Sequence, residues 1–216
     1  MRKSIFLLPL VLWAGTATAE PVTIAALGDS LTQGYGLPAE DGFVSQLQSW
    51  LIAQGADVTL INAGVSGDTT AGGASRVAWT LTPEVDAMIV TLGGNDLLRG
   101  LEPSMSRTHL ETILSTAQAS DVEVLLVGME APGNFGPDYK DRFDAMYPEL
   151  AQTYGTLFAP GFFEGLIKVA GDDPAAMRPY FQADGIHPNA DGVALIVEEL
   201  GPYVLDLIDR VEDAQQ

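Results

Sequence analysis

Gly28-Asp29-Ser30-Leu31-Thr32-Gln33-Gly34 is a polar stretch between two glycines, and it follows directly on the apolar run 22–27. The apolar run is typical of a buried strand, and the polar stretch is typical of a turn into a helix. Such a turn lies at the carboxyl end of its strand, where open α/β folds bind ligands. The stretch predicts a nucleophile at Ser30, with the alternative that Asp29 or Ser30 only caps a helix.

The glycines around Ser30 do not fit the G-x-S-x-G nucleophile elbow, because the next glycine after Ser30 is Gly34 and not the residue two positions on. The sequence therefore indicates a serine-hydrolase framework of another kind.

Short β-type runs alternate with helical segments along the chain, which is the pattern of a parallel sheet with helices on both faces. We expect one domain over residues 20–216, because no repeat or linker divides them. The expected strands are 22–27, 57–61, 86–92, 122–127 and 156–159. The expected helices are 42–54, 103–119, 139–154, 162–169 and 189–211, the last with a kink at Gly201-Pro202.

Each of the first three expected strands is followed by a polar turn that contains glycine. These turns are 28–30, 64–68 and 93–96. Because all strand-to-helix turns of a parallel sheet open at its carboxyl edge, we expect the three turns to converge there.

Ser30 needs a base, and the chain has two histidines. We interpret His109 as a helix-face residue, because it lies within an expected amphipathic helix and no motif surrounds it. His187 stands in Asp184-Gly185-Ile186-His187-Pro188-Asn189. In a tight turn the Asp184 carboxylate can accept the Nδ1–H of His187, which leaves Nε2 free to take the Ser30 proton. The alternative is an ordinary Asp-Gly turn before a helix start stiffened by proline.

Acyl transfer also needs hydrogen-bond donors for the oxyanion. Gly67 can present a backbone N–H in a turn with positive φ, Asn95 can present its side-chain amide, and the N–H of Ser30 is a third donor. Taken singly, Gly67 and Asn95 are better explained as turn residues.

Four blocks stand in a fixed order over most of the chain: Gly28-Asp29-Ser30-Leu31, 64–68, Gly93-Gly94-Asn95-Asp96 and Asp184-x-x-His187. Together they resemble the S, G, N and H blocks of the SGNH (GDSL) hydrolases, and in particular the secreted single-domain esterase, thioesterase and lysophospholipase branch. The resemblance implies a triad of Ser30, Asp184 and His187, an oxyanion hole from Ser30, Gly67 and Asn95, and no cofactor. It also implies a three-layer α/β/α sandwich, flavodoxin-like, with five parallel strands in the order 2-1-3-4-5.

The expected function is hydrolysis of acyl esters, with thioesters as further candidates, through an acyl-enzyme intermediate. We expect aliphatic acyl chains of medium or greater length, and the resemblance favours 97–102 as the specificity segment. Packing beneath a loop explains any one of the apolar residues near the expected turns as well as an acyl groove does. These residues are Leu31, Tyr35, Leu37, Leu97, Leu98, Leu101, Phe135 and Ile186.

Three rival functions are less well supported. A carbohydrate O-deacetylase of the same superfamily would need aromatic, hydrogen-bonding walls, whereas the turns here are rich in leucine. A non-catalytic binding protein would be expected to lack a triad or oxyanion residue, and this chain retains all of them. A metal hydrolase is disfavoured, because two distant histidines and no H-E-x-x-H motif leave no nitrogen-rich metal site.

The formal net charge is −19, which argues against binding to nucleic acid or to anionic lipid. The chain has no cysteine, so disulfides, thiolate metal sites and cysteine nucleophiles are excluded.

Residues 1–19 have the pattern of a secretory signal peptide: basic Arg2 and Lys3, an apolar core over 5–14, and the small-x-small site 17–19. A membrane span would need about 20 apolar residues. We therefore expect cleavage after Ala19 and a secreted or periplasmic monomer without a stable membrane anchor. Its expected partner is a small-molecule acyl ester.

Overall fold

The computed structural model of the protein describes residues 20–171 and 173–214, so the expected signal peptide lies outside the described residues. In this part of the chain, five parallel strands form one sheet in the order β2-β1-β3-β4-β5. The strand number and order confirm the expectation from the sequence. The strands are β1 (Val22–Gly28), β2 (Val58–Gly64), β3 (Ala87–Thr91), β4 (Glu123–Val127) and β5 (Leu157–Ala159).

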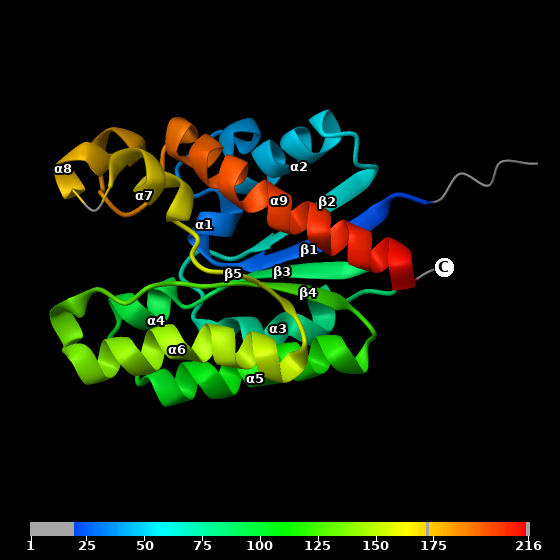
Figure 1. Ribbon diagram of the computed structural model, residues 1–216, viewed down its shortest axis with the longest axis horizontal. Coiled ribbons are helices and arrows are strands. Elements are labelled where there is room, and N and C mark those ends of the chain that lie inside the picture. Colours follow the sequence, from blue (N-terminus) through cyan, green and yellow to red (C-terminus); the bar gives the residue numbers. More distant parts are fainter. Residues whose placement is uncertain (1–19, 172, 215–216) are drawn as a thin grey trace, which may run out of the picture.

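Helices cover both faces of the sheet and complete a three-layer α/β/α sandwich (Figure 1). One face carries α1 (Ser30–Gln33), α2 (Phe43–Ala53), α7 (Glu164–Ala170), α8 (Pro174–Met177) and α9 (Ala190–Ala214). The other carries α3 (Thr70–Thr80), α4 (Gly94–Leu98), α5 (Pro103–Ala119) and α6 (Pro137–Tyr154). Short 3-10 turns lie at Ala39–Asp41, Gly133–Phe135 and Arg178–Tyr180.

The middle strands β1, β3 and β4 are apolar throughout because helices cover both of their faces. Ile24, Leu27 and Ile89 have no measurable exposure. Burying such a side chain contributes about 1.5–3 kcal/mol. Ile89→Ala would therefore remove this contribution and leave a cavity, at a cost of about 2–5 kcal/mol.

Helix α3 was not expected from the sequence, because its residues show little apolar periodicity. Its contact with the sheet depends on a glycine: a Cβ at Gly73 would lie 2.3 Å from Cδ1 of Leu92. The helix begins after Thr69, whose side chain accepts a hydrogen bond from the N–H of Gly72 at 3.4 Å. Helix α3 thus packs through its backbone at Gly73, and not through a row of large apolar side chains.

Helix α9 continues as one element across Pro202, and its buried residues follow helical spacing as expected. Gly201 lets α9 approach α2 closely, because a Cβ there would lie 2.4 Å from the ring of Trp50. This packing fixes the helix that directly follows the segment of His187.

The first three strands end at one edge of the sheet. Gly28 at the end of β1 pairs in register with Gly64 of β2 and with Thr91 of β3. The polar turns after these strands therefore begin side by side, as their order in a parallel sheet predicts.

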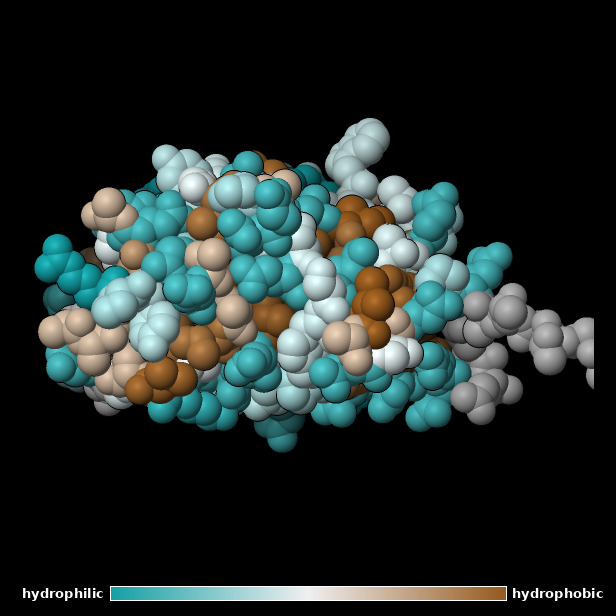
Figure 2. Space-filling view, turned by 90° about the horizontal axis from the view of Figure 1, so that it is seen from above, coloured by the Kyte–Doolittle hydropathy of each residue, from teal (hydrophilic) through white to brown (hydrophobic). Residues whose placement is uncertain are grey.

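The surface over α2 and α9 is mostly hydrophilic, with small separate hydrophobic patches (Figure 2). Within residues 20–171 and 173–214, no helix combines the length and apolar character needed to cross a membrane.

Candidate active site

Ser30 is the first residue of α1, at the carboxyl end of β1. The Asp29 side chain caps this helix by accepting the N–H of Leu31 at 3.0 Å. Gly28 allows the tight exit from the strand, since a Cβ there would lie about 2 Å from the hydroxyl oxygens of Thr32 and Thr91. The glycine-bracketed sequence thus presents Ser30 at the sheet edge.

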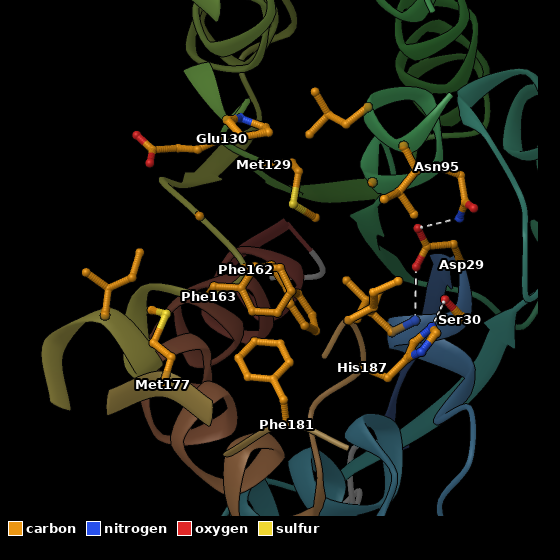
Figure 3. A pocket seen from close by; sticks show the side chains of 18 of the residues that line it. Asp29, Ser30, Asn95, Met129, Glu130, Phe162, Phe163, Met177, Phe181 and His187 are labelled. Atoms are coloured by element: carbon orange, nitrogen blue, oxygen red, sulfur yellow. Dashed lines mark hydrogen bonds between the residues drawn. The ribbon is translucent and has the colours of Figure 1, made fainter. Parts of the chain in front are cut away.

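Ser30, His187 and Asp184 form a continuous chain of contacts, and Figure 3 shows the part between Ser30 and His187. The Nε2 atom of His187 lies 2.9 Å from Ser30 Oγ, although 157 positions separate the two residues. The Nδ1 atom of His187 lies 2.7 Å from Asp184 Oδ2. With Nδ1–H donated to the carboxylate, Nε2 is the acceptor that faces the serine hydroxyl. The Asp184-x-x-His187 spacing predicted the contact between these two side chains.

The segment that carries His187 is fastened to the rest of the site by backbone and side-chain bonds. Phe181 and Pro188 form an isolated antiparallel bridge. Next to this bridge, the N–H of Gln182 donates to the carbonyl of His187 at 2.8 Å, and the Gln182 Nε2 donates to the carbonyls of Pro188 and Tyr35. These bonds hold the imidazole against the segment that follows Ser30.

Asp184 is held as a carboxylate. The hydrogen bond from His187 and the backbone N–H groups of Ile186 and His187 lower the pKa of Asp184 from its usual 3.8 to about 2. Asp184 therefore stays negatively charged at any ordinary assay pH.

The two other predicted oxyanion donors lie on the turns after β2 and β3. Asn95 on α4 donates one Nδ2–H to Asp29 Oδ2 at 3.1 Å (Figure 3). Gly67 has φ of 84°, as expected for a turn with positive φ, and its carbonyl accepts a hydrogen bond from Arg99 at 2.8 Å. Ser30 and Asn95 line the adjoining cavity, whereas Gly67 is not among the residues that line it.

A cavity of about 470 Å³ opens beside Ser30, Asn95 and His187. Its volume is in the range of small-molecule sites. Five of the residues predicted to contact substrate line it: Leu31, Leu97, Leu98, Phe135 and Ile186.

Three other apolar residues named from the sequence lie elsewhere. Leu101 is half-buried outside the cavity lining, and its carbonyl accepts the Tyr139 hydroxyl at 2.8 Å. Leu37 packs against the core, and the Tyr35 ring lies against His187. The expected specificity segment 97–102 therefore contributes Leu97 and Leu98 but not Leu101.

The sequence did not single out the far wall of the cavity. Met129 and Phe162 follow β4 and β5, so the edge argument that located the first three turns also applies to them. They carry no polar motif, which is why they were missed. The additional apolar lining residues are Met129, Phe162, Phe163, Ile167, Met177 and Phe181 (Figure 3).

His109 belongs to a different polar group, on the helices below the sheet. Its Nδ1 lies 3.2 Å from Thr70 Oγ1, and Thr70 donates to the buried carboxylate of Asp96 at 2.6 Å. Ser106 also donates to Asp96, at 2.8 Å. His109 is thus a partly buried helix residue with a structural contact. Across residues 20–171 and 173–214, no group of three or more His, Asp or Glu is arranged to hold a metal ion.

Comparisons with known proteins agree with this geometry. A profile of the GDSL-like Lipase/Acylhydrolase family matches residues 26–195. Esterase TesA of Pseudomonas aeruginosa is 37% identical over 202 residues, which cover 93% of this chain and 96% of that protein. Thioesterase 1/protease 1/lysophospholipase L1 of Escherichia coli K12 is 32% identical over 208 residues, which cover 95% of this chain and 93% of that protein.

Among solved structures, the crystal structure of AlinE4, described as an SGNH-hydrolase family esterase, aligns with a TM-score of 0.69 at 39% identity. The alignment covers 88% of this chain and 98% of that one. The fold and the site thus define an α/β serine hydrolase scaffold. The chain belongs to the GDSL-like lipase/acylhydrolase family, and it is an enzyme that hydrolyses acyl esters.

Proposed function

We propose that Ser30 is the nucleophile of a two-step acyl transfer. Its Oγ attacks the ester carbonyl carbon while His187 Nε2 takes the hydroxyl proton. His187 then gives this proton to the departing alcohol or thiol, and the acyl group stays on Ser30. Water, deprotonated by His187, releases the acid and restores the serine. The observation that carries this proposal is the chain from Ser30 Oγ through His187 to Asp184, with contacts of 2.9 and 2.7 Å.

In the proposed mechanism, the negative charge on the carbonyl oxygen is stabilised by the N–H groups of Ser30 and Gly67 and by Asn95 Nδ2. Fixed donors of this kind favour the transition state over the bound ester, because the charge develops only during the reaction. The position of Asn95 on the cavity wall, beside Ser30, supports its part in this group.

We further propose aliphatic esters of medium or greater chain length as the preferred substrates, with the acyl chain in the cavity. Phe162, Phe163, Met177 and Phe181 give this cavity an apolar wall away from Ser30 (Figure 3). Each buried methylene contributes about 0.8 kcal/mol, so a wall that half covers the chain gives roughly a twofold gain in kcat/KM per carbon. This wall is aromatic, whereas the turns named from the sequence are rich in leucine, so it does not separate acyl esters from acetylated sugars.

We also propose that the enzyme acts outside the cytoplasm, with a mature chain that starts at Glu20. The basic, apolar and small-x-small segments of residues 1–19 support this location. Removing them leaves 8 basic and 29 acidic residues, a net charge of −21. N-terminal sequencing of the exported protein tests the cleavage site, and full-length protein recovered in the membrane fraction would contradict it.

Labelling with an organophosphonate that reacts with serine nucleophiles tests the proposed mechanism. We expect one label per wild-type chain, on the peptide that contains Ser30, with complete loss of p-nitrophenyl ester hydrolysis. Ser30→Ala should fold, remain unlabelled and lose turnover, and His187→Ala should lose turnover by several orders of magnitude. His109→Ala is the matched control and should keep its activity. Retained turnover in Ser30→Ala would overturn the assignment.

A further inference from the structure

The proposed mechanism does not use the most deeply buried carboxyl group of the site. Asp29 is 2% exposed, although it is the sequence neighbour of Ser30. Burying a carboxylate is costly unless hydrogen bonds compensate for the lost water. The contacts of Asp29 therefore indicate why the site contains it.

Both oxygens of Asp29 accept N–H groups, and each connects to a different part of the site. Oδ1 accepts the backbone N–H of Leu31 at 3.0 Å, which fixes the turn that carries Ser30. Oδ2 accepts the side-chain Nδ2–H of Asn95 at 3.1 Å (Figure 3). Gly94 leaves room for this approach, because a Cβ there would lie 3.2 Å from Asp29 Oδ2. One carboxylate thus bridges the first and third sequence blocks.

We propose that Asp29 is a positioning residue that orients the Asn95 amide toward the reacting carbonyl. This inference rests on the proposed role of Asn95 as an oxyanion donor. An Asn side chain has two orientations, which exchange its oxygen and its nitrogen. A carboxylate accepts hydrogen bonds and donates none, so Asp29 selects the orientation with Nδ2 toward itself. The second N–H of the same nitrogen is left for the substrate oxygen.

The reversed orientation would be harmful to the reaction. It would turn the carbonyl oxygen of Asn95 toward the place of its nitrogen, so that two partial negative charges would face each other in the transition state. Holding the amide in advance also avoids the cost of ordering it during the reaction. Asp29 therefore acts through Asn95 and not on the substrate itself.

Burial disfavours the charged form of Asp29, so a buried carboxylate at this position lowers the stability of the fold. The pKa of Asp29 is raised above its usual value, because the effect of burial exceeds the opposing effect of the hydrogen bonds from Leu31 and Asn95. Buried carboxyl groups with such opposing influences are common in active sites.

A set of variants separates positioning of Asn95 from simple helix capping. We expect Asp29→Ala to lower kcat about 10- to 100-fold on p-nitrophenyl butyrate, with KM within about twofold, since one oxyanion donor is worth about 10²–10³. Asp29→Ser keeps a capping side chain but is too short to hold Asn95. It should recover the melting temperature and not kcat. Asp86→Ala is the matched control: it loses a carboxylate that accepts the Thr23 N–H at 2.8 Å, outside the site, and should keep kcat.

The decisive measurement is the double variant with Asn95→Ala. If Asp29 acts through Asn95, the double variant should lie within about threefold of Asn95→Ala alone, because the two losses are not independent. Losses that multiply would overturn the proposal, as would full kcat in Asp29→Ala or recovered kcat in Asp29→Ser. Full kcat in Asn95→Ala would refute the oxyanion role and this inference together. Should Asp29→Ala fail to fold, the comparison is made with Asp29→Ser and its double variant.

Discussion

The aromatic ring of Tyr35 lies against the imidazole of His187, with ring centroids 4.6 Å apart and planes inclined by 38°. Tyr35 follows α1 and its side chain is half exposed, so the ring covers the imidazole from the solvent side. The segment of Ser30, the proposed nucleophile, therefore also supplies a contact that holds His187, the proposed base, in place.

Loss of this contact should lower the turnover number. Aromatic pairs contribute about 0.5–1.5 kcal/mol beyond burial, which corresponds to a two- to tenfold decrease in kcat for Tyr35→Ala. Tyr35→Phe keeps the ring and should behave as wild type. Steady-state kinetics on a soluble short-chain ester measures both, and equal losses in the two variants would point to the hydroxyl group instead.

The amide of Asn95 should matter for the rate more than for binding. We expect Asn95→Ala to lower kcat by about 10²–10³ with little change in KM, because the donor is needed where charge develops. The measurement is a full kinetic curve on one p-nitrophenyl ester. A rise in KM at constant kcat would mean that Asn95 binds the ground-state ester.

Asp184 gives a prediction about pH. Its pKa in the folded protein is about 2, below the usual 3.8, so the hydrogen bonds to its carboxylate stabilise the fold fully above about pH 4, and this stabilisation is lost as the pH falls through 2. The difference in melting temperature between wild type and Asp184→Asn should therefore be constant from pH 8 to about pH 4 and vanish near pH 2. A difference that already disappears between pH 7 and pH 5 would contradict the lowered pKa.

The far wall of the cavity should set the acyl-chain preference. Ile167→Ala and Met177→Ala remove apolar surface from this wall, so kcat/KM should fall about two- to tenfold for decanoyl esters and stay unchanged for acetyl esters. Leu101→Ala is the matched control, since Leu101 lies outside the lining. A p-nitrophenyl ester series from two to twelve carbons checks this, and an altered profile in the control alone would place the acyl chain elsewhere.

Gly93 should be essential for stability. Its φ is 122°, and a Cβ there would lie 2.0 Å from the hydroxyl oxygen of Tyr147, which donates to the Leu92 carbonyl at 2.9 Å. Gly93→Ala should cost about 2–4 kcal/mol from backbone strain and overpacking together. Adding Tyr147→Phe removes the clashing atom and should recover part of this loss. Thermal unfolding measures this recovery. If the double variant is no more stable than Gly93→Ala, the whole loss of stability comes from backbone strain.

The sequence predicted the sheet because its central strands are continuous apolar runs. Ile24 and Ile89 are buried in strands with helices on both faces, and such strands are apolar at successive positions, which is easily recognised in the sequence. The meeting of Ser30 with His187 was also predictable, because a parallel sheet brings its strand-to-helix turns to one edge. The Asp184 spacing predicted the pairing of Asp184 with His187, whereas the bridge between Phe181 and Pro188 that holds this segment at the site leaves no signal in the sequence.

Other parts of the molecule leave no such pattern. Helix α3 packs through Gly73, so apolar spacing does not reveal it. The cavity wall combines Met129, which follows β4, with Met177 of α8, and no motif in the sequence shows that these two segments line one cavity. Leu101 was named for its place near Asn95, but which side of a loop faces a cavity depends on backbone bonds such as that to Tyr139.

The order of the site along the chain has a consequence for biosynthesis. Ser30 stands near the start of the described chain, whereas His187 directly precedes α9, the last helix. During translation, β1 and Ser30 are synthesised long before His187. A nascent or unfolded chain therefore has Ser30 without the imidazole that contacts it in the folded protein, and the proposed mechanism requires that the segment of His187 has docked.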